Sequence, residues 1–411
     1  MYETREAEEK VILVAVSCSE RDRTEESLDE LCALCETAGA TAVARVVQNR
    51  EAVHAGTYVG KGKILEIKEL INECGATGIV CDDELSPAQI SNLSDELEVK
   101  IMDRTLIILD IFAARATSSE GKIQVELAQL KYRATRLVGL RNSLSRLGGG
   151  IGTRGPGETK LEMDRRLIHE RIGFLKGQLE NVAASRAINR SQRMRSHTPV
   201  VAIVGYTNAG KSTLLNTLTD AGVLSEDKLF ATLDPTTRNL VLESGQNVIL
   251  SDTVGFIRNL PHQLIEAFKS TLEEAAYADI ILHVADASNP EVDEQMHVVY
   301  ETLKKIGVKN QPVITAFNKI DRMDNPIRPK DMRADYSVCI SAKTGEGLDE
   351  LKNTIETVLR QSRVYLEKVF SYSEAGKIAT VRKYGQLISE EYVAEGIAVK
   401  AYVPSEIYHT L

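Results

Sequence analysis

One glycine-rich stretch of the 411-residue sequence has the spacing that binds phosphate groups. Residues 205–212 read GYTNAGKS and match the pattern G-x-x-x-x-G-K-[ST]. The apolar run 199–204 precedes them, and residues 211–218 (KSTLLNTL) are typical of a helix. In that setting, backbone N–H groups and the helix N-terminus bind phosphate oxygens. The predicted phosphate-binding residues are Gly205, Tyr206, Thr207, Asn208, Ala209, Gly210, Lys211 and Ser212.

Two of these side chains, and a short motif that follows, predict chemistry at the terminal phosphate. We expect Lys211 to pair with the β- and γ-phosphates, and the Ser212 hydroxyl to ligate Mg²⁺. The motif Asp252, Thr253, Val254 and Gly255 ends the apolar run 247–251. A carboxylate at Asp252 can hold a Mg²⁺-bound water, and the Gly255 backbone N–H can approach a γ-phosphate closely. Together with the phosphate loop, this motif indicates a nucleoside triphosphate site.

A further motif predicts which base the nucleotide carries. Asn318, Lys319, Ile320 and Asp321 end the apolar run 312–317. A carboxylate only accepts hydrogen bonds, so Asp321 can take both N1–H and N2–H of guanine, whereas adenine has a bare N1 there. The wrong base would leave this charge unpaired, which favours GTP over ATP. We expect Asn318 to tie this loop to the phosphate loop and the Lys319 stem to lie over the base. After the next strand, guanine O6 would meet the backbone of Ser341, Ala342 and Lys343, with Ala342 as the donor.

These motifs occur in the order of a Ras-like GTPase, which the region resembles. The resemblance implies a threonine that coordinates Mg²⁺ and senses the γ-phosphate. Three threonines compete for this role, and spacing alone does not decide among them. The candidate segment is Phe230, Ala231, Thr232, Leu233, Asp234, Pro235, Thr236 and Thr237.

Phe256 follows the DTVG motif, where many Ras-like GTPases carry a Gln that orients the attacking water. We group Phe256 with Lys211 and Gly255 as the catalytic residues. A phenyl ring cannot orient water, so one interpretation is slow hydrolysis until a partner completes the geometry. Phe256 could equally pack against the sheet, and the two interpretations are compatible. Arg238 and Arg258 flank these segments, and each could act as an arginine finger or be an ordinary exposed arginine.

The elements around these motifs predict an α/β protein with several domains. Strand and helix patterns alternate through residues 1–110, which predicts a small parallel sheet covered by helices. Residues 111–197 carry two seven-residue apolar patterns of a coiled-coil seam, separated by the glycine-rich stretch 148–157, which predicts a long antiparallel helical hairpin. The seam residues are Ile123, Leu127, Leu130, Ala134, Leu137, Leu140 (or Arg141), Leu144 and Leu147, and then Leu161, Ile168, Ile172, Leu175, Leu179 and Val182. Residues 198–362 alternate again and form the predicted P-loop Ras-like GTPase domain. Residues 363–411 have strand-like runs, including 380–384 (TVRKY) and 396–404, and predict a small α+β domain.

Charge separates the hairpin from the rest of the chain. The net charge is −9, from 50 Lys and Arg against 59 Asp and Glu, which argues against nucleic-acid binding if it is evenly spread. Residues 115–197, however, hold 17 Lys and Arg against 7 Asp and Glu, a net charge of +10 that leaves −19 elsewhere. Basic side chains on a projecting hairpin, with Arg146 and Arg154 at its tip, suit RNA phosphates. A solvated coiled-coil face is the plainer alternative.

The composition and the N-terminal sequence argue against several other classes of protein. With 43% hydrophobic and 27% charged residues, the chain is globular rather than disordered. Cys32 and Cys35 form a CxxC pair, which is half a zinc site at best and fits thiols facing a core. The N-terminus is acidic and polar, and no apolar run approaches the roughly 20 residues of a membrane span, so we expect a cytoplasmic protein. The GKGK stretch 60–63 and the acidic stretch 82–84 could hold a phosphate or a metal, but an ordinary helix start and a strand-end loop explain them as well.

Several longer segments resemble the HflX family of translation-associated GTPases, and the likeness covers nearly the whole chain. It favours Thr232 as the Mg²⁺ ligand and implies an N-terminal α/β domain, a helical hairpin and a GTPase domain. It also implies GTP and GDP as ligands, and binding to the large ribosomal subunit with splitting or rescue of stalled ribosomes. The segments are 56–63, 124–132, 145–166, 205–212, 230–238 and 252–261.

The leading hypothesis is therefore a monomeric GTP hydrolase that contacts the RNA of the large ribosomal subunit through the basic hairpin. One alternative is a regulatory GTPase switch with protein effectors, in which the hairpin is a dimerising coiled coil that binds no RNA. Another is hydrolysis of ATP or of another nucleotide, in which case the motif at 318–321 does not select guanine.

Overall fold

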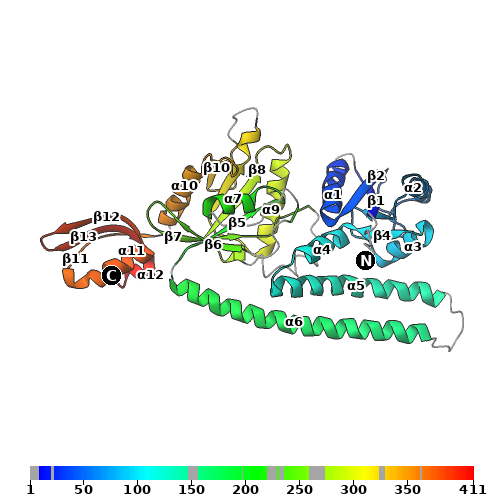
Figure 1. The fold of residues 1–411 in the computed structure, drawn as a ribbon, viewed down its shortest axis with the longest axis horizontal. Coiled ribbons are helices and arrows are strands. Elements are labelled where there is room, and N and C mark those ends of the chain that lie inside the picture. Colours follow the sequence, from blue (N-terminus) through cyan, green and yellow to red (C-terminus); the bar gives the residue numbers. More distant parts are fainter. Residues whose placement is uncertain are drawn as a thin grey trace, which may run out of the picture. The chain divides into compact units, whose positions relative to one another are not determined.

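The structure is a computed structural model, and its description covers residues 9–19, 23–146, 156–196, 198–219, 229–230, 236–258, 274–323, 329–361 and 363–411. Contacts divide the chain into two compact units, with the main break after Val182, and each is described by itself. The fold is of the α/β class, as the sequence predicted (Figure 1).

The first sheet has four parallel strands in the order β2-β1-β3-β4. Helices surround the sheet, and its central strand β1 is apolar and buried from Val11 to Val16, as expected for a strand covered on both faces. Helices α1 and α2 are followed by Gly39 and Gly75, which cap them in the left-handed conformation. The elements are β1 (Glu9–Ser17), α1 (Thr24–Ala38), β2 (Ala40–Asn49), α2 (Lys61–Cys74), β3 (Gly78–Cys81), α3 (Pro87–Leu97), β4 (Lys100–Asp103) and α4 (Arg104–Arg115).

Two long helices follow, α5 (Ser119–Arg146) and α6 (Pro156–Ser196), and run antiparallel side by side (Figure 1). Arg171 of α6 makes a bidentate ion pair with Glu126 of α5, at 2.8 and 3.0 Å. Leu127 and Leu175 are buried on the predicted seam. Residues 147–155 lie outside the described part, and with them Arg154.

The packing of α5 differs from the expectation of a single apolar seam. Val125, Ala128 and Tyr132 are buried although they lie off that seam. Helix α5 packs on α3 and α4 of the N-terminal domain. The predicted boundary between residues 110 and 111 falls inside α4, and the domain boundaries stay predictions.

The second sheet has six strands in the order β10-β9-β8-β5-β7-β6. All neighbours are parallel except β6, which pairs antiparallel with β7. The sequence predicted the five parallel strands and missed β6, an edge strand in which only Leu240 is buried. The elements are β5 (Val200–Gly205), α7 (Lys211–Thr219), β6 (Thr236–Val241), β7 (Asn247–Asp252), β8 (Ile280–Asp286), α9 (Val292–Ile306), β9 (Val313–Asn318), the 3₁₀ turn η1 (Ile320–Arg322), β10 (Tyr336–Cys339) and α10 (Leu348–Gln361).

The last elements form a three-stranded antiparallel sheet, in the order β11-β13-β12, with helices on one face. The prediction of a strand at residues 380–384 is wrong, because they complete helix α11. Ile378 and Val381 lie three residues apart and are both buried in this domain's core, which helical spacing allows. The elements are β11 (Val364–Phe370), η2 (Tyr372–Glu374), α11 (Ala375–Tyr384), β12 (Gln386–Val393), β13 (Gly396–Val403) and α12 (Ser405–Tyr408).

Within the described residues, none of the helices combines the length and the apolar character that a bilayer crossing requires.

Candidate functional site

The phosphate loop connects β5 to α7, as the sequence predicted. Gly210 has a φ of +94°, and a β-carbon there would collide with Nδ2 of Asn318, so the loop needs glycine at this point. Asn208 also has a positive φ, of 59°, and its side chain is exposed. The turn thus leads directly into the N-terminus of α7, where backbone N–H groups are available for an anion.

Lys211 is buried at the start of α7, and its Nζ donates to the carbonyl oxygen of Tyr206 at 2.8 Å. Burial lowers the pKa of Lys211 to about 8, and the nearby Asp252 carboxylate opposes that shift. The next side chain, Ser212, donates its hydroxyl to Oδ2 of Asp252 at 2.9 Å. A lysine, a hydroxyl and a carboxylate therefore meet at the mouth of the loop.

The DTVG motif runs from the end of β7 along the phosphate loop. Asp252 is fully buried, and Thr253 donates to the carbonyl oxygen of Ile203 at 2.8 Å. Gly255 lies so close to Thr207 and Lys211 that a β-carbon would be 2.8 Å from Cγ2 of the first and 3.1 Å from Nζ of the second. The motif is thus placed beside the lysine, as binding of a γ-phosphate requires.

Phe256 is fixed by its backbone and faces away from solvent. Its N–H donates to the Gly205 carbonyl at 3.1 Å, and its carbonyl accepts from the Thr207 N–H at 2.8 Å. The ring is only 2% exposed. In this conformation Phe256 contributes packing and no polar group to the site.

The base-recognition loops are joined through Asn318. Its Nδ2 donates to the Ala209 carbonyl at 2.8 Å, and its Oδ1 accepts from the Ala342 N–H at 2.9 Å. One buried amide therefore holds the phosphate loop and both predicted base loops together. The expected tie between Asn318 and the phosphate loop is present.

The carboxylate of Asp321, which the sequence predicts to select guanine, is exposed. Ser341 donates its hydroxyl to Oδ1 of Asp321 at 2.6 Å, and this bond holds the pKa of Asp321 below its usual range. Asp321 is therefore ionised at neutral pH, as recognition of N1–H and N2–H requires. Ile320 lies in the 3₁₀ turn beside it, and the neighbouring Lys343 is exposed.

Sequence reasoning missed Asp286, which is the ion-pair partner of Lys319 in this loop. Lys319 has a φ of 66°, and its Nζ pairs with Oδ2 of Asp286 at 2.7 Å. Asp286 ends β8, next to Asn318 in the sheet register. The sequence feature that could have identified Asp286 is its position as an acidic residue at the end of a buried strand.

The remaining candidates are only partly described. Phe230 is buried with a φ of 55°, but Ala231, Thr232, Leu233 and Asp234 lie outside the described residues. Arg238 is exposed on β6 and donates to the Thr237 carbonyl at 3.1 Å, while Arg258 is half-buried.

The minor candidates in the N-terminal domain have structural partners. Asp82 pairs with the buried Arg104, and Asp83 accepts from Tyr58. Lys63 pairs with Glu66 at 2.7 Å. Burial raises the pKa of Cys35 to about 12, which makes it an inert thiol. Across the described residues, no group of His, Cys, Asp and Glu has the arrangement of a metal site.

Known families cover consecutive parts of this chain. The family described as "GTP-binding GTPase N-terminal" matches residues 25–113, "GTP-binding GTPase Middle Region" matches 115–193, and "50S ribosome-binding GTPase" matches 200–319. A solved GTP-binding protein from the archaeon Sulfolobus solfataricus, in complex with GDP, is 26% identical with a TM-score of 0.45 and covers 86% of this chain and 99% of that one.

Close relatives match over most or all of the chain. GTPase HflX from Lacrimispora saccharolytica is 66% identical over 411 residues, or 100% of this chain and 97% of that protein. GTPase HflX from Escherichia coli (strain K12) is 44% identical over 355 residues, or 85% of this chain and 83% of that protein. The nucleotide-binding fold and these relatives agree, and the chain belongs to the HflX family of GTP hydrolases.

Proposed function

We propose that this GTPase uses Mg²⁺, binds the large ribosomal subunit through its basic hairpin, and splits or rescues stalled ribosomes in the cytoplasm as a monomer. The observation that carries the ribosomal part is the net charge of +10 on residues 115–197, which include exposed cations on both hairpin helices. The name of the matched family, "50S ribosome-binding GTPase", supports the same partner.

The oxygen ligands near Lys211 fit Mg²⁺. Ser212 and Asp252 offer a hydroxyl and a carboxylate joined by a 2.9 Å hydrogen bond, and Mg²⁺ prefers such oxygen donors. Ser212 would ligate the ion directly, Asp252 would hold one of its waters, and Thr232 would complete the protein ligands. The ion would neutralise charge that develops on the β- and γ-phosphates. Lys211 would bind the same phosphates, and Asp321 with Ala342 would orient the base.

The buried Phe256 supports slow hydrolysis by the isolated protein. Its ring supplies no group that could orient a water, and its backbone is tied to the phosphate loop at 2.8 and 3.1 Å. Orientation of the water must then come from another group. We infer that the large subunit stimulates hydrolysis by completing this geometry.

The hairpin cations divide into two groups. Arg136 and Arg171 are bound to carboxylates of the same compact unit, Asp103 and Glu126. Exposed cations lie on both helices, and these are the groups that can contact phosphates: Lys122, Arg133, Arg165, Arg166 and Lys176. Of these, Arg166 also pairs with the exposed Glu170 on the same helix, at 3.4 Å. Such contacts would release counterions, so affinity should fall steeply with salt.

Co-sedimentation with purified large subunits tests this proposal. With a GTP analogue, the wild-type protein should pellet with the subunits more than it does with GDP, and subunits should raise GTP turnover. Replacing Arg165 and Arg166 by Gln should reduce the slope of log affinity against log salt by about 1.4–1.8 if each meets one phosphate. Lys304→Gln with Lys305→Gln, an exposed pair on α9, is the matched control and should leave the slope unchanged. Absence of both pelleting and stimulation would refute the ribosomal function.

A specific feature favours the alternative of a dimerising hairpin. Met163, Leu167 and Phe174 are 57%, 53% and 56% exposed, and their spacing of four and seven residues places them on one face of α6. A second copy could cover this stripe. Sedimentation velocity across protein concentrations separates the two: a dimer that persists in high salt, with no pelleting by subunits, would support the coiled-coil switch.

A further inference from the structure

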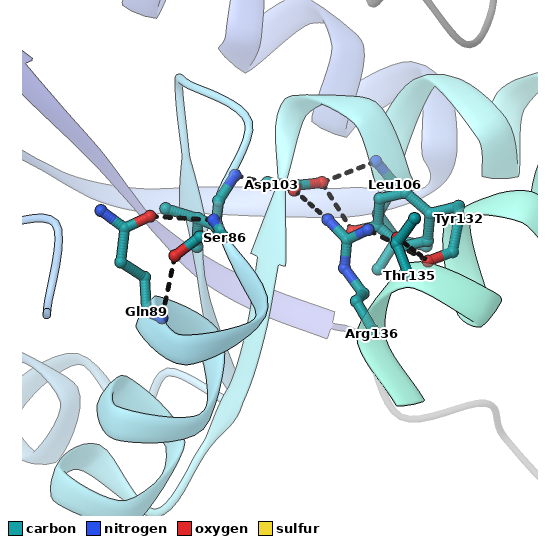
Figure 2. A network of polar contacts seen from close by, with 8 residues as sticks. Ser86, Gln89, Asp103, Leu106, Tyr132, Thr135 and Arg136 are labelled. Carbon is teal, nitrogen blue, oxygen red and sulfur yellow. Dashed lines mark hydrogen bonds and ion pairs between the residues drawn. The ribbon is translucent and has the colours of Figure 1, made fainter. Parts of the chain in front are cut away.

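A single buried carboxylate joins the N-terminal domain to the hairpin. Asp103 ends β4, caps α4 and is fully buried. Its Oδ1 accepts from the Leu106 N–H at 2.9 Å, and its Oδ2 accepts from the Leu85 N–H at 3.1 Å. These two bonds tie it to the backbone of the N-terminal domain (Figure 2).

Helix α5 supplies the remaining two bonds. The Tyr132 hydroxyl donates to Oδ1 at 2.7 Å, and Nη2 of Arg136 donates to Oδ2 at 2.6 Å. Each oxygen of Asp103 therefore accepts one bond from the N-terminal domain and one from the hairpin. Figure 2 shows Asp103 between Leu106 and the α5 residues Tyr132 and Arg136. The Arg136 guanidinium also lies 3.1 Å from the centre of the Tyr132 ring.

The geometry of these four hydrogen bonds suits a joint that fixes the direction of α5 relative to the N-terminal domain. The apolar side chains of α5, such as Val125 and Ala128, pack on the domain without directional preference. Bonds from side chains one helical turn apart to the two oxygens of one carboxylate allow little rotation or sliding of α5. Buried ion pairs are weak contributors to stability, and their best-attested role is to specify register. Burial and the Asp103 charge raise the pKa of Tyr132, so the phenol stays protonated and can donate.

We propose that Asp103, Tyr132 and Arg136 form a positioning joint that sets the direction in which the hairpin leaves the N-terminal domain, and so determines where the hairpin's cations meet RNA. This inference rests on the proposed binding of the hairpin to the large subunit. Tyr132 is only 4% exposed, so it acts through α5 and not by touching RNA.

Tyr132→Phe is the sharpest test, because it keeps the ring and removes one bond to Asp103. Ser86→Ala is the matched control: it removes the side-chain cap of α3 in the same domain, a bond from the Gln89 N–H to the Ser86 hydroxyl at the N-terminus of α3. Binding to large subunits in the presence of a GTP analogue and hydrogen exchange of residues 123–136 are measured well below the unfolding temperature. Basal GTP turnover reports that each variant is folded.

Tyr132→Phe should weaken subunit binding at least fivefold and speed exchange in α5, while Ser86→Ala stays within twofold of wild type in both. Arg136→Lys should retain more affinity than Arg136→Ala, because it keeps a cation for Asp103. If Tyr132→Phe binds like wild type while the Arg165 and Arg166 variant binds weakly, the joint is refuted and the ribosomal function stands. If Ser86→Ala weakens binding equally, the effect is general destabilisation and the joint is again refuted. If neither the charge variant nor Tyr132→Phe changes binding, both proposals fail.

Discussion

Gly210→Ala is expected to weaken guanine-nucleotide binding by displacing Asn318. Gly210 has a φ of +94°, and an added β-carbon would collide with Nδ2 of Asn318. That atom donates to the Ala209 carbonyl at 2.8 Å, while the same side chain accepts from the Ala342 N–H. Asn318 is 2% exposed and has little room to withdraw, so the collision should separate the phosphate loop from the base loops.

The size of the effect follows from two contributions. Alanine in a left-handed conformation costs about 1–2 kcal/mol. Loss of the bond between Asn318 and Ala209 costs a further ~0.5–1.5 kcal/mol. Without nucleotide the loop can relax, whereas bound phosphates hold it in place, so both contributions reduce affinity. Together they predict a roughly 10- to 400-fold higher Kd for GDP at 25 °C.

Gly307→Ala separates the collision from backbone strain. Gly307 ends α9 with the same φ of +94°, but no atom lies within 4 Å of its added β-carbon. The control therefore carries comparable backbone strain at the end of α9, outside the phosphate loop, so it should destabilise folding and leave GDP affinity like that of the wild type. Titration calorimetry gives both Kd values, and thermal unfolding shows that both variants are folded. Equal GDP affinity of the two variants would refute the argument.

Three further predictions concern the same site. Asp286→Asn removes the charge opposite Lys319, whose Nζ lies 2.7 Å away. Hydrogen bonds to charged groups are worth about 1.5–3 kcal/mol and the amide keeps part of this energy, so GDP release should become about fivefold faster. An unchanged release rate in stopped-flow measurements would contradict this prediction. Burial lowers the pKa of Lys211 to about 8, and bound phosphates would raise it. GDP affinity should therefore be constant below pH 7 and fall as the pH rises through 8, where binding takes up a proton. Calorimetry that finds no proton uptake on GDP binding at pH 8.5 would rule this out. Asp321→Asn should weaken GTP binding and favour xanthosine triphosphate, and an unaltered preference for GTP in competition would revive the ATP alternative.

The nucleotide site was the part most open to prediction. A loop that wraps phosphate needs glycine where φ is positive, as at Gly210, and guanine selection needs an acceptor such as Asp321. These demands restrict residue type at fixed spacing, so they are visible in one sequence. Asp286 was missed because its partner, Lys319, lies 33 positions away in the chain and only the parallel pairing of β8 and β9 brings them together.

The packing of α5 and the position of β6 were less open to prediction. Helix α5 contacts α3 and α4 as well as lying beside α6, so it is buried on more than one face. Its apolar residues therefore lie on two faces, one along the seven-residue seam and one toward α3 and α4. The spacing of apolar residues in the sequence predicted only the seam. Strand β6 lies at an edge and exposes Thr237, Arg238 and Asn239, so its sequence lacks the continuous apolar run of the buried strands.

The C-terminal residues had no assigned chemistry in the sequence, and in the structure two of them, Arg363 and Gln386, form hydrogen bonds with the nucleotide domain. Glu356 of α10 is 7% exposed, and its Oε1 accepts from the N–H and the hydroxyl of Ser244, at 3.0 and 2.8 Å, in the turn between β6 and β7. Its Oε2 accepts from Gln386 of β12 at 3.3 Å, and Arg363 donates to Gln246 in the same turn.

The turn held by Glu356 lies at the opposite end of β6 and β7 from Asp252. Sliding these strands would leave a buried carboxylate without its donors, at a cost of about 1–3 kcal/mol for each lost bond. Glu356 therefore holds the strand pair at the Ser244 end, and Arg363 and Gln386 of the C-terminal residues add bonds to Gln246 and to Glu356. Because that end is fixed, a structural response to GTP hydrolysis is expected in the loops at the Asp252 end, beside Lys211 and Gly255, where the γ-phosphate would be lost.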